Sequence, residues 1–434
     1  MNNRLVDIGS IFRALSNRNY RLFFSGQSIS LIGTWMQQVA VSWLVYRMTN
    51  SPLLLGVVGF VGQIPTFLVT PFAGVIADRY NRRRMLIITQ VASMIQASIL
   101  AALVLSKTIQ VWEIMVLSTM LGIINSFDIP IRQAFTVEMI ENREHLGNAI
   151  ALNSSMVNAA RLIGPSVAGI LIASVGEGIC FFCNAVSYIP VIASFFMMQV
   201  ARKIEEPPKT HIIKQLKEGL SYAFNFSPIK YILLLLALVS LTGVPYQVLM
   251  PVFARDIFHG GPHTLGFLIA MSGVGALAGA IYLAARKSVV GLGGIIALTA
   301  GLFGIGILAF SVSRILWASM LILLVSGFGM MVQMAASNTV LQTIVDEDKR
   351  GRIMSFYTMS FMGMAPFGSL FAGSMANKIG APATLMIGGS CCVIGALIFC
   401  FKLSAIREKI HPIYARKGII PEVAKGIQSV ETMR

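Results

Sequence analysis

The chain has 434 residues, of which 56% are hydrophobic and only 12% are charged, and its mean hydropathy is +0.75. These values exclude an ordinary soluble domain and indicate a polytopic membrane protein. The formal net charge of +16 does not require a nucleic-acid partner, because most of the Lys and Arg fall in short segments that one topology places on the cytoplasmic side.

Apolar runs long enough to cross a membrane recur along the whole chain. A bilayer core of about 30 Å needs about 20 apolar residues per helix. On this scale the sequence predicts twelve transmembrane helices, at residues 21–46, 53–77, 85–106, 111–135, 147–173, 178–200, 230–254, 264–285, 291–312, 316–344, 353–376 and 383–402.

A change of composition after the sixth predicted helix divides the chain. Pro207 and Pro208 end that helix, and residues 212–226 alternate apolar and charged residues as a helix on a membrane surface does. Gly147 and Gly351 then begin similar segments 204 residues apart, which indicates two pseudo-symmetric six-helix bundles. The first predicted unit, residues 1–200, is a six-helix bundle with a cytoplasmic arm, and a cytoplasmic linker follows at residues 201–229. The second bundle is predicted at residues 230–402 and a cytoplasmic tail at residues 403–434.

A basic loop separates the second and third predicted helices. Residues 74–86 read Gly-Val-Ile-Ala-Asp-Arg-Tyr-Asn-Arg-Arg-Arg-Met-Leu, and these charges must lie at a membrane surface to stay hydrated. The loop resembles the signature G-x-L-a-D-r-x-G-r-k of the major facilitator superfamily. Asn81 replaces the second Gly, and we expect a positive φ there because Asn tolerates one better than most residues. The matching positions are Gly74, Ile76, Ala77, Asp78, Arg79, Arg82 and Arg83.

This resemblance implies an all-α fold of two bundles and a gate at the cytoplasmic side. In the superfamily the loop aspartate lies against the start of the eleventh helix, and a loop arginine pairs with an acid on the fourth. Carried over by motif position, this places Asp78 near residues 351–354 and Arg82 against Asp128, with Arg132 one helical turn away. The alternative is plain positive-inside charge with no gating function. The expected gating residues are Gly74, Asp78, Arg79, Arg82, Arg83, Asp128 and Arg132.

Longer stretches are similar to one bacterial branch of this superfamily, which contains drug and siderophore exporters such as the enterobactin exporter. The resemblance implies a multidrug or siderophore efflux transporter in the bacterial inner membrane, with both termini cytoplasmic. A Gly-Pro element of the fifth helix, typical of exporters, permits a kink and close packing. The segments that carry the resemblance are residues 18–23, 33–35, 127–135, 158–165 and 164–169.

Arg161 is a cation in the middle of a predicted helix. Counting from Gly147 at about 1.5 Å per residue places it roughly 20 Å into the membrane, whereas Asp128 reaches about half that depth. Ionisable groups at this depth are costly, so each needs a partner or a function. Two interpretations stay open. With Asn158 and Ser154 on the same face, Arg161 attracts an anionic part of a substrate, or it caps carbonyls and amides and joins the fourth and fifth helices.

Neutral polar residues form a stripe along the first predicted helix. Lipid would not tolerate such a face, so we expect it to point into the bundle or into a watery cavity. Flexible Met and Phe side chains suit the rest of a cavity for unlike hydrophobic cargo. The expected substrate-cavity residues are Gln27, Thr34, Gln38, Asn125, Asn158, Arg161, Tyr246 and Gln333.

Coupling to protons is implied by the resemblance alone, because Asp128 is the one candidate carboxylate away from the outer ends of the helices. We therefore expect secondary export of an amphiphilic small molecule by alternating access, with proton antiport as the coupling suggested by the family. The alternatives are a lysophospholipid-type lipid transporter and a non-transporting sensor or partner-binding protein. Cys180-x-x-Cys183 has no second ligand pair nearby, so we expect no metal or cofactor. No buried nucleophile and base occur together, so we expect no enzymatic activity. We also expect the protein to be a monomer in the lipid bilayer.

Overall fold

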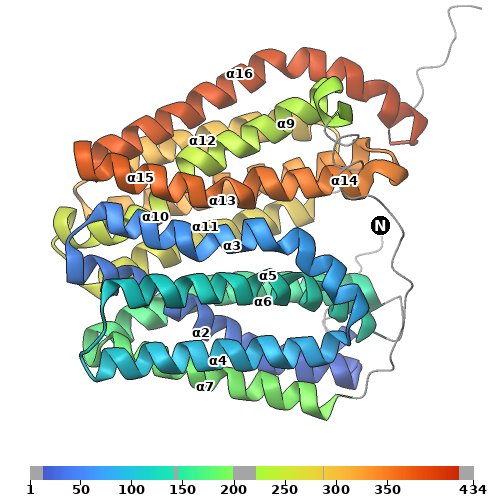
Figure 1. The fold of residues 1–434 in the computed structure, drawn as a ribbon. Coiled ribbons are helices and arrows are strands. Elements are labelled where there is room, and N and C mark those ends of the chain that lie inside the picture. The colour runs from blue at the N-terminus through green and yellow to red at the C-terminus, as the bar shows by residue number, and fades with distance from the viewer. Residues whose placement is uncertain (1–12, 141–144, 199–220, 287, 420–434) are drawn as a thin grey trace, which may run out of the picture.

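The computed structural model describes residues 13–140, 145–198, 221–286 and 288–419, except for the side chains of residues 71, 72, 74–79 and 348. These residues form helices and contain no strand (Figure 1). The first half of the chain, here the N-half, contains α2 Arg18–Thr49, α3 Pro52–Arg79, α4 Arg82–Leu105, α5 Val111–Glu138, α6 Leu146–Val175 and α7 Glu177–Met197.

The second half, here the C-half, contains helices that are interrupted in two places. A π-helical segment, Val239–Gly243, joins α9 to α10, and another, Met359–Gly363, joins α14 to α15. Counted with these breaks, α2 to α7 form six rods and the C-half forms six more, which agrees with the twelve predicted helices. The C-half helices are α9 Ser227–Leu238, α10 Tyr246–Val252, α11 Pro262–Ala285, α12 Leu292–Val312, α13 Leu316–Ile344, α14 Glu347–Thr358, α15 Ala365–Ile379 and α16 Ala381–Arg416.

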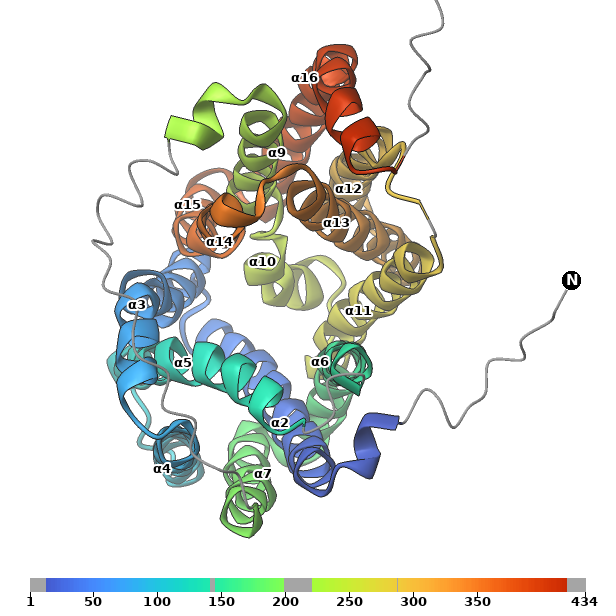
Figure 2. The same ribbon diagram turned by 90° about the vertical axis from the view of Figure 1, so that its right-hand side faces the viewer.

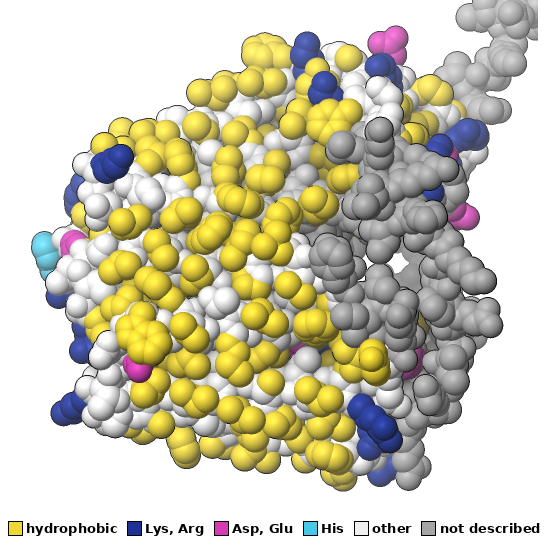
Figure 3. All heavy atoms as spheres, in the orientation of Figure 1, with side chains coloured by type: hydrophobic (Ala, Val, Ile, Leu, Met, Phe, Trp, Pro, Cys, Tyr) yellow, Lys and Arg dark blue, Asp and Glu magenta, His cyan; other side chains and the backbone are white. Residues whose placement is uncertain are grey.

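Length and composition select 10 of these rods as candidate membrane spans within the described residues. The two outside this selection are α2, which carries the polar stripe, and α14–α15, which the π-helical segment interrupts. Hydrophobic side chains cover the middle of the surface, and basic and acidic side chains lie toward both ends (Figure 3). This distribution is typical of a protein that crosses a bilayer.

Two ends of the molecule are distinguished below. The terminus end is where α2 begins and α16 finishes, at the right of Figure 1, and the far end is the opposite one, where α2 meets α3. Two local predictions are corrected at the terminus end. Asn81 has a φ of −69° rather than a positive one, because its Oδ1 caps α4 by accepting from the Arg84 amide at 3.0 Å. The loop between the second and third helices is also shorter than predicted, since α3 continues to Arg79 and α4 begins at Arg82.

The last helix is longer than predicted. We expected a tail from residue 403, yet α16 continues to Arg416 because Ile406, Ile410 and Tyr414 repeat at helical spacing and are buried. Most of the predicted surface helix at 212–226 and the cytoplasmic arm at 1–12 lie outside the described residues.

The two halves meet along two equivalent seams, α6 against α11 and α3 against α15 (Figure 2). Both seams bring glycine backbones together. A Cβ added to Gly266 would lie 2.9 Å from the Cα of Gly169, and one added to Gly373 would lie 2.7 Å from the Cα of Gly56. Gly169 and Gly373 are 204 residues apart, the offset of the sequence repeat. The internal symmetry therefore extends to the contact between the halves.

The hydrophobic core is continuous across the halves only toward the far end. One cluster there includes Val39, Leu44 and Ile172 of the N-half together with Leu249 and Phe253 of the C-half. A second cluster belongs to the N-half alone and lies toward the terminus end; it includes Tyr20, Phe23, Leu86, Phe135 and Phe195. Apolar packing thus holds the halves together at one end of the molecule.

Candidate functional site

A polar cluster joins the halves at the far end. The Tyr46 hydroxyl of α2 donates to the Asp256 carboxylate, which lies in the π-helical segment Phe253–Ile257 after α10. Arg255 Nη1 donates to Asn50 Oδ1 at 2.6 Å, and its guanidinium carbon lies 5.9 Å from the centre of the Tyr46 ring. We call these four residues the far-end latch.

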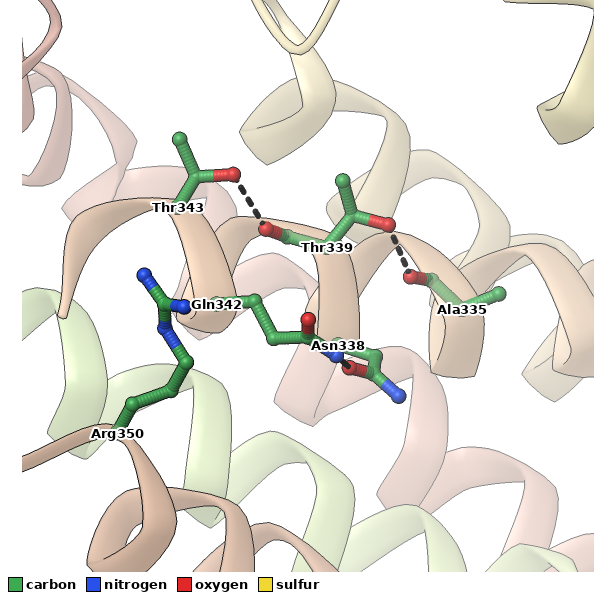
Figure 4. A pocket seen from close by; sticks show the side chains of 6 residues that line it. All are labelled: Ala335, Asn338, Thr339, Gln342, Thr343 and Arg350. Carbon is green, nitrogen blue, oxygen red and sulfur yellow. Dashed lines mark hydrogen bonds between the residues drawn. The ribbon is translucent and has the colours of Figure 1, made fainter. Parts of the chain in front are cut away.

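The hydrogen bonds seen between described residues of the N-half and the C-half, which involve Tyr46, Asn50, Arg255 and Asp256, lie in this latch. At the terminus end the described ion pairs stay within one half, such as Arg82 with Glu138 and Arg416 with Asp346. A cavity of about 500 Å³ lies at that end of the C-half, lined by Ala335, Asn338, Thr339, Gln342, Thr343 and Arg350 (Figure 4). The halves are therefore joined at the far end and hollowed at the terminus end.

The predicted pair of Arg82 with Asp128 is not formed in this structure. Arg82 Nη1 lies 2.5 Å from Glu138 Oε1 instead. Glu138 is about 15 Å further along α5 than Asp128 at the usual helical rise, which brings it level with the start of α4. We predicted that pair for the state closed at the cytoplasmic side. A sequence motif does not give the depth of an acid relative to the loop, so it did not indicate Glu138 as the partner seen here. The side chains of Gly74, Asp78 and Arg79 lie outside the description.

Arg83, another predicted gating residue, caps a neighbouring helix. Its Nε donates to the carbonyl of residue 195 at 2.6 Å and its Nη2 to that of residue 196 at 2.9 Å. These carbonyls end α7, where a cation offsets the negative end of the helix dipole. Arg83 thus ties α4 to α7 within the N-half.

Asp128 is held inside the N-half. Its carboxylate is buried, with 4% of the residue exposed. It accepts from Thr89 Oγ1 at 2.9 Å and from Gln90 Nε2 at 2.7 Å, and Arg132 Nη2 lies 3.4 Å away. The predicted proximity of Asp128 and Arg132 is confirmed.

Arg161 lies where three helices meet. Its guanidinium carbon is 5.7 Å from the centre of the Trp35 ring of α2. A Cβ on Gly273 of α11 would lie 3.3 Å from the Arg161 carbonyl, so the other half packs directly on this turn of α6. Tyr246 of α10 interacts electrostatically with the guanidinium, and its hydroxyl is 2.6 Å from Ser272 Oγ. Residues from both halves therefore surround this cation.

Among the described residues the Arg161 guanidinium makes no hydrogen bond or ion pair. The interpretation that it caps carbonyls or amides between the fourth and fifth helices therefore finds no contact to support it. A guanidinium in contact with an aromatic face keeps its five N–H groups available for a ligand.

The other predicted cavity residues divide into two groups. Asn125 and Asn158 are half-buried, Thr34 is half-buried, and Gln38 on the same face of α2 is exposed. Gln27, Tyr246 and Gln333 are buried, none more than 2% exposed, so in this conformation they do not line an open cavity. Polar spacing does not distinguish a cavity wall from a contact between helices. Both amide atoms of Gln333 nevertheless lack a hydrogen-bond partner.

The rest of the α2 stripe shows the same division. Gln37 donates to Gln96 at 3.0 Å and accepts from Asn184 at 2.7 Å, inside the N-half. Neither the far-end latch nor the role of Glu138 was predicted from the sequence. For Glu138 the available signal was its position at the end of the fourth predicted helix. For the latch no local signal exists, because Tyr46 and Asp256 are 210 residues apart.

Comparisons with known proteins agree with this architecture. Residues 9–419 match the family described as transmembrane secretion effector. The staphyloferrin A transporter of Staphylococcus aureus is 27% identical over 90% of this chain and 98% of its own. Macrolide efflux protein A of Streptococcus pyogenes is 24% identical over the same shares. A bacterial homologue of the human lysosomal transporter spinster, solved in an inward-facing and unoccupied conformation, superimposes with a TM-score of 0.72 at 12% identity, over 90% of this chain and 98% of its own.

The described residues form twelve helical rods in two equivalent halves, with a half-buried cation between them. These features define a multi-pass membrane transporter of the major facilitator type, a class of transporters rather than enzymes. Within that class the chain belongs to the transmembrane secretion effector family. The predicted superfamily, its fold and its relation to siderophore and drug efflux proteins are confirmed.

Proposed function

We propose that this transporter exports an amphiphilic small molecule across the bacterial inner membrane by alternating access, with the terminus end in the cytoplasm. The observation that supports this is the one-sided contact between the halves. All described hydrogen bonds between them lie in the far-end latch, and the C-half has a cavity at the terminus end. Such a conformation is open to the cytoplasm, and the glycine seams are surfaces about which the halves can move.

Arg161 supports an anionic group on the cargo. Its charge has no carboxylate partner among the described residues, and the buried acids Asp128 and Glu177 are both engaged, by Arg132 and Arg47 respectively. A cationic drug would therefore find no free acid beside this site. Relatives named for staphyloferrin A and for macrolides suggest two cargo classes to compare.

The gate and the coupling ion are parts of the same proposal. Asp78, in the last turns of α3 with Gly74 and Arg79, would contact the start of α14 when the terminus end closes. Arg82 would remain on Glu138, the partner that it has in the open state. We assign proton antiport to Asp128, because protonation would weaken its pair with Arg132 within α5 and the hydrogen bonds that it accepts from Thr89 and Gln90 of α4.

Uptake into inverted vesicles tests the proposal, with staphyloferrin A and a macrolide compared under an imposed proton gradient. Export by the native chain appears as uptake that requires the gradient. Arg161→Met should lower uptake of staphyloferrin A about tenfold or more, the loss of one charge-assisted contact, while Arg161→Lys should retain part of it.

Two results would contradict specific parts. If Arg161→Met lowers uptake of both cargoes equally, its function is structural. If Asp78→Asn transports at the native rate, the gate is assigned wrongly. Alternating access itself requires cysteine probes at the two ends to exchange accessibility during transport.

A further inference from the structure

The cavity at the terminus end has one polar wall and one cation. The wall is a single face of α13, since its residues are three and four positions apart. Figure 4 shows Arg350, from α14, extending toward that face. None of the six residues that line the cavity in the described chain is acidic. The lining is thus electropositive, although the α13–α14 corner beside it contains acids.

Most polar groups in the wall are already engaged. The hydroxyls of Thr339 and Thr343 donate to carbonyls one turn back in α13, and Gln342 Nε2 donates to Asn338 Oδ1 at 2.6 Å. Arg350 is the exception. Its Nε is buried without a hydrogen-bond partner. The guanidinium therefore has donors to offer a ligand.

Among the described side chains, which do not include that of Asp348, the acids near Arg350 do not neutralise it. Glu347 is 3.7 Å from Arg350 Nη2, but its side chain is 90% exposed, so the pair is weak. Asp346 is contacted by two other cations, Lys349 at 3.8 Å and Arg416 at 3.4 Å. The described acids therefore compensate the charge of Arg350 only in part.

The end of α16 holds this wall in place. Lys417 Nζ donates to the Thr343 carbonyl at 2.7 Å, which caps the end of α13 with a cation. Lys349 lies 4.5 Å from the centre of the Tyr222 ring, so the start of α14 is also held by the segment before α9. Helix α13 packs mainly against α11 and α12 of its own half, which leaves its polar face toward the cavity. The site is therefore preformed.

We propose that this cavity binds the oxyanion of an amphiphilic molecule, a carboxylate or a phosphate, with Arg350 as its anchor. The guanidinium fork matches two oxygens of such a group, and Gln342 and Asn338 supply the neighbouring polar contacts. This proposal rests on the proposed function in one respect only: during the transport cycle, an anion bound in this cavity next reaches Arg161. The oxyanion can come from dissolved cargo or from a lipid headgroup.

Binding to the purified full chain tests the site without any transport. In phosphatidylcholine nanodiscs, citrate is titrated by calorimetry, with triethyl citrate as its uncharged analogue. We expect citrate to bind at least tenfold more tightly than the ester and more weakly as salt screens the charge. Arg350→Gln should weaken citrate binding about tenfold, and Arg350→Lys should restore part of it.

Arg407→Gln is the matched control, because it removes the same charge from an exposed position of α16. A parallel arm places a photoreactive group at residue 342 and measures labelling of phosphatidylglycerol against phosphatidylcholine. Labelling that depends on Arg350 and favours phosphatidylglycerol, without citrate binding, identifies a lipid headgroup as the source of the oxyanion.

Three results overturn the proposal: equal effects of Arg350→Gln and Arg407→Gln, measurable binding of citrate and its ester with equal affinity, or neither citrate binding nor selective lipid labelling. If Arg350→Gln does not fold, Gln342→Ala in the native background provides the same comparison, with an expected loss of a few-fold. Oxyanion binding without vesicle uptake would sustain this site while rejecting the transport proposal.

Discussion

Removing one hydroxyl from the far-end latch should shift the balance between the two open states. Tyr46→Phe keeps the ring against Arg255 but deletes the donor to Asp256. No hydrogen bond between the halves at the terminus end is described to replace it. The population in which the far end is open should therefore increase.

The size of the effect follows from the exposure of the partners. Tyr46 is 3% exposed, but Asp256 is on the surface, so its carboxylate is rehydrated after the change and no buried charge is left unpaired. The loss is then about 1 kcal/mol, the typical net contribution of a hydrogen bond, because hydration of the exposed carboxylate removes the extra strength of a charged acceptor. This corresponds to a shift of about fivefold in the equilibrium between the two states.

Spin labels at Lys107 and Arg314, in far-end loops of the N-half and the C-half, report this equilibrium as a distribution of distances. Tyr46→Phe should increase the longer-distance population about fivefold. Tyr282→Phe, which deletes a hydroxyl with no described hydrogen bond, should leave it unchanged. Identical distributions for native protein and Tyr46→Phe would show that the latch does not stabilise this state.

Three further changes test other contacts. Gly266→Val should lower stability by about 3 kcal/mol, because its Cβ would lie 2.5 Å from a carbonyl oxygen of α6, while Gly147→Val, with nothing within 4 Å, should melt near the native temperature. Asp128→Asn should lower the free energy of unfolding by about 2 kcal/mol, because it leaves a half-buried Arg132 without its carboxylate. Adding Arg132→Gln should recover part of the melting temperature. A lower melting temperature in the double variant than in Asp128→Asn would contradict the pairing. Lys417→Gln should speed hydrogen exchange in residues 343–349, and unchanged exchange would mean that this cap does not hold the corner.

The helices were predictable because a bilayer imposes a length and an apolar composition on each of them. The prediction for α13, 316–344, matches its observed bounds, Leu316–Ile344. The end of α16 was missed because charged residues hide an apolar repeat, formed by Ile406, Ile410 and Tyr414, that a search for membrane spans ignores.

The candidate site was predictable only where one residue was itself exceptional. Arg161 could be identified because a cation at its depth is costly anywhere. The contacts that a side chain makes were harder to predict from the sequence. Arg82 contacts Glu138 here and not Asp128, because the relative depth of the two acids depends on how α4 and α5 align. The contact of Tyr46 with Asp256 depends on how the halves dock, which no local pattern encodes.

The paired glycines at the two seams have a mechanical consequence. Where backbone meets backbone, at Gly169 with Gly266 and at Gly56 with Gly373, no side chain interlocks with a socket on the opposite helix. A rotation there changes few rotamers and opens no large void, so its enthalpic barrier stays low. The glycine contacts thus offer little resistance to a relative rotation of the two halves, and the polar contacts of the far-end latch favour the conformation seen here.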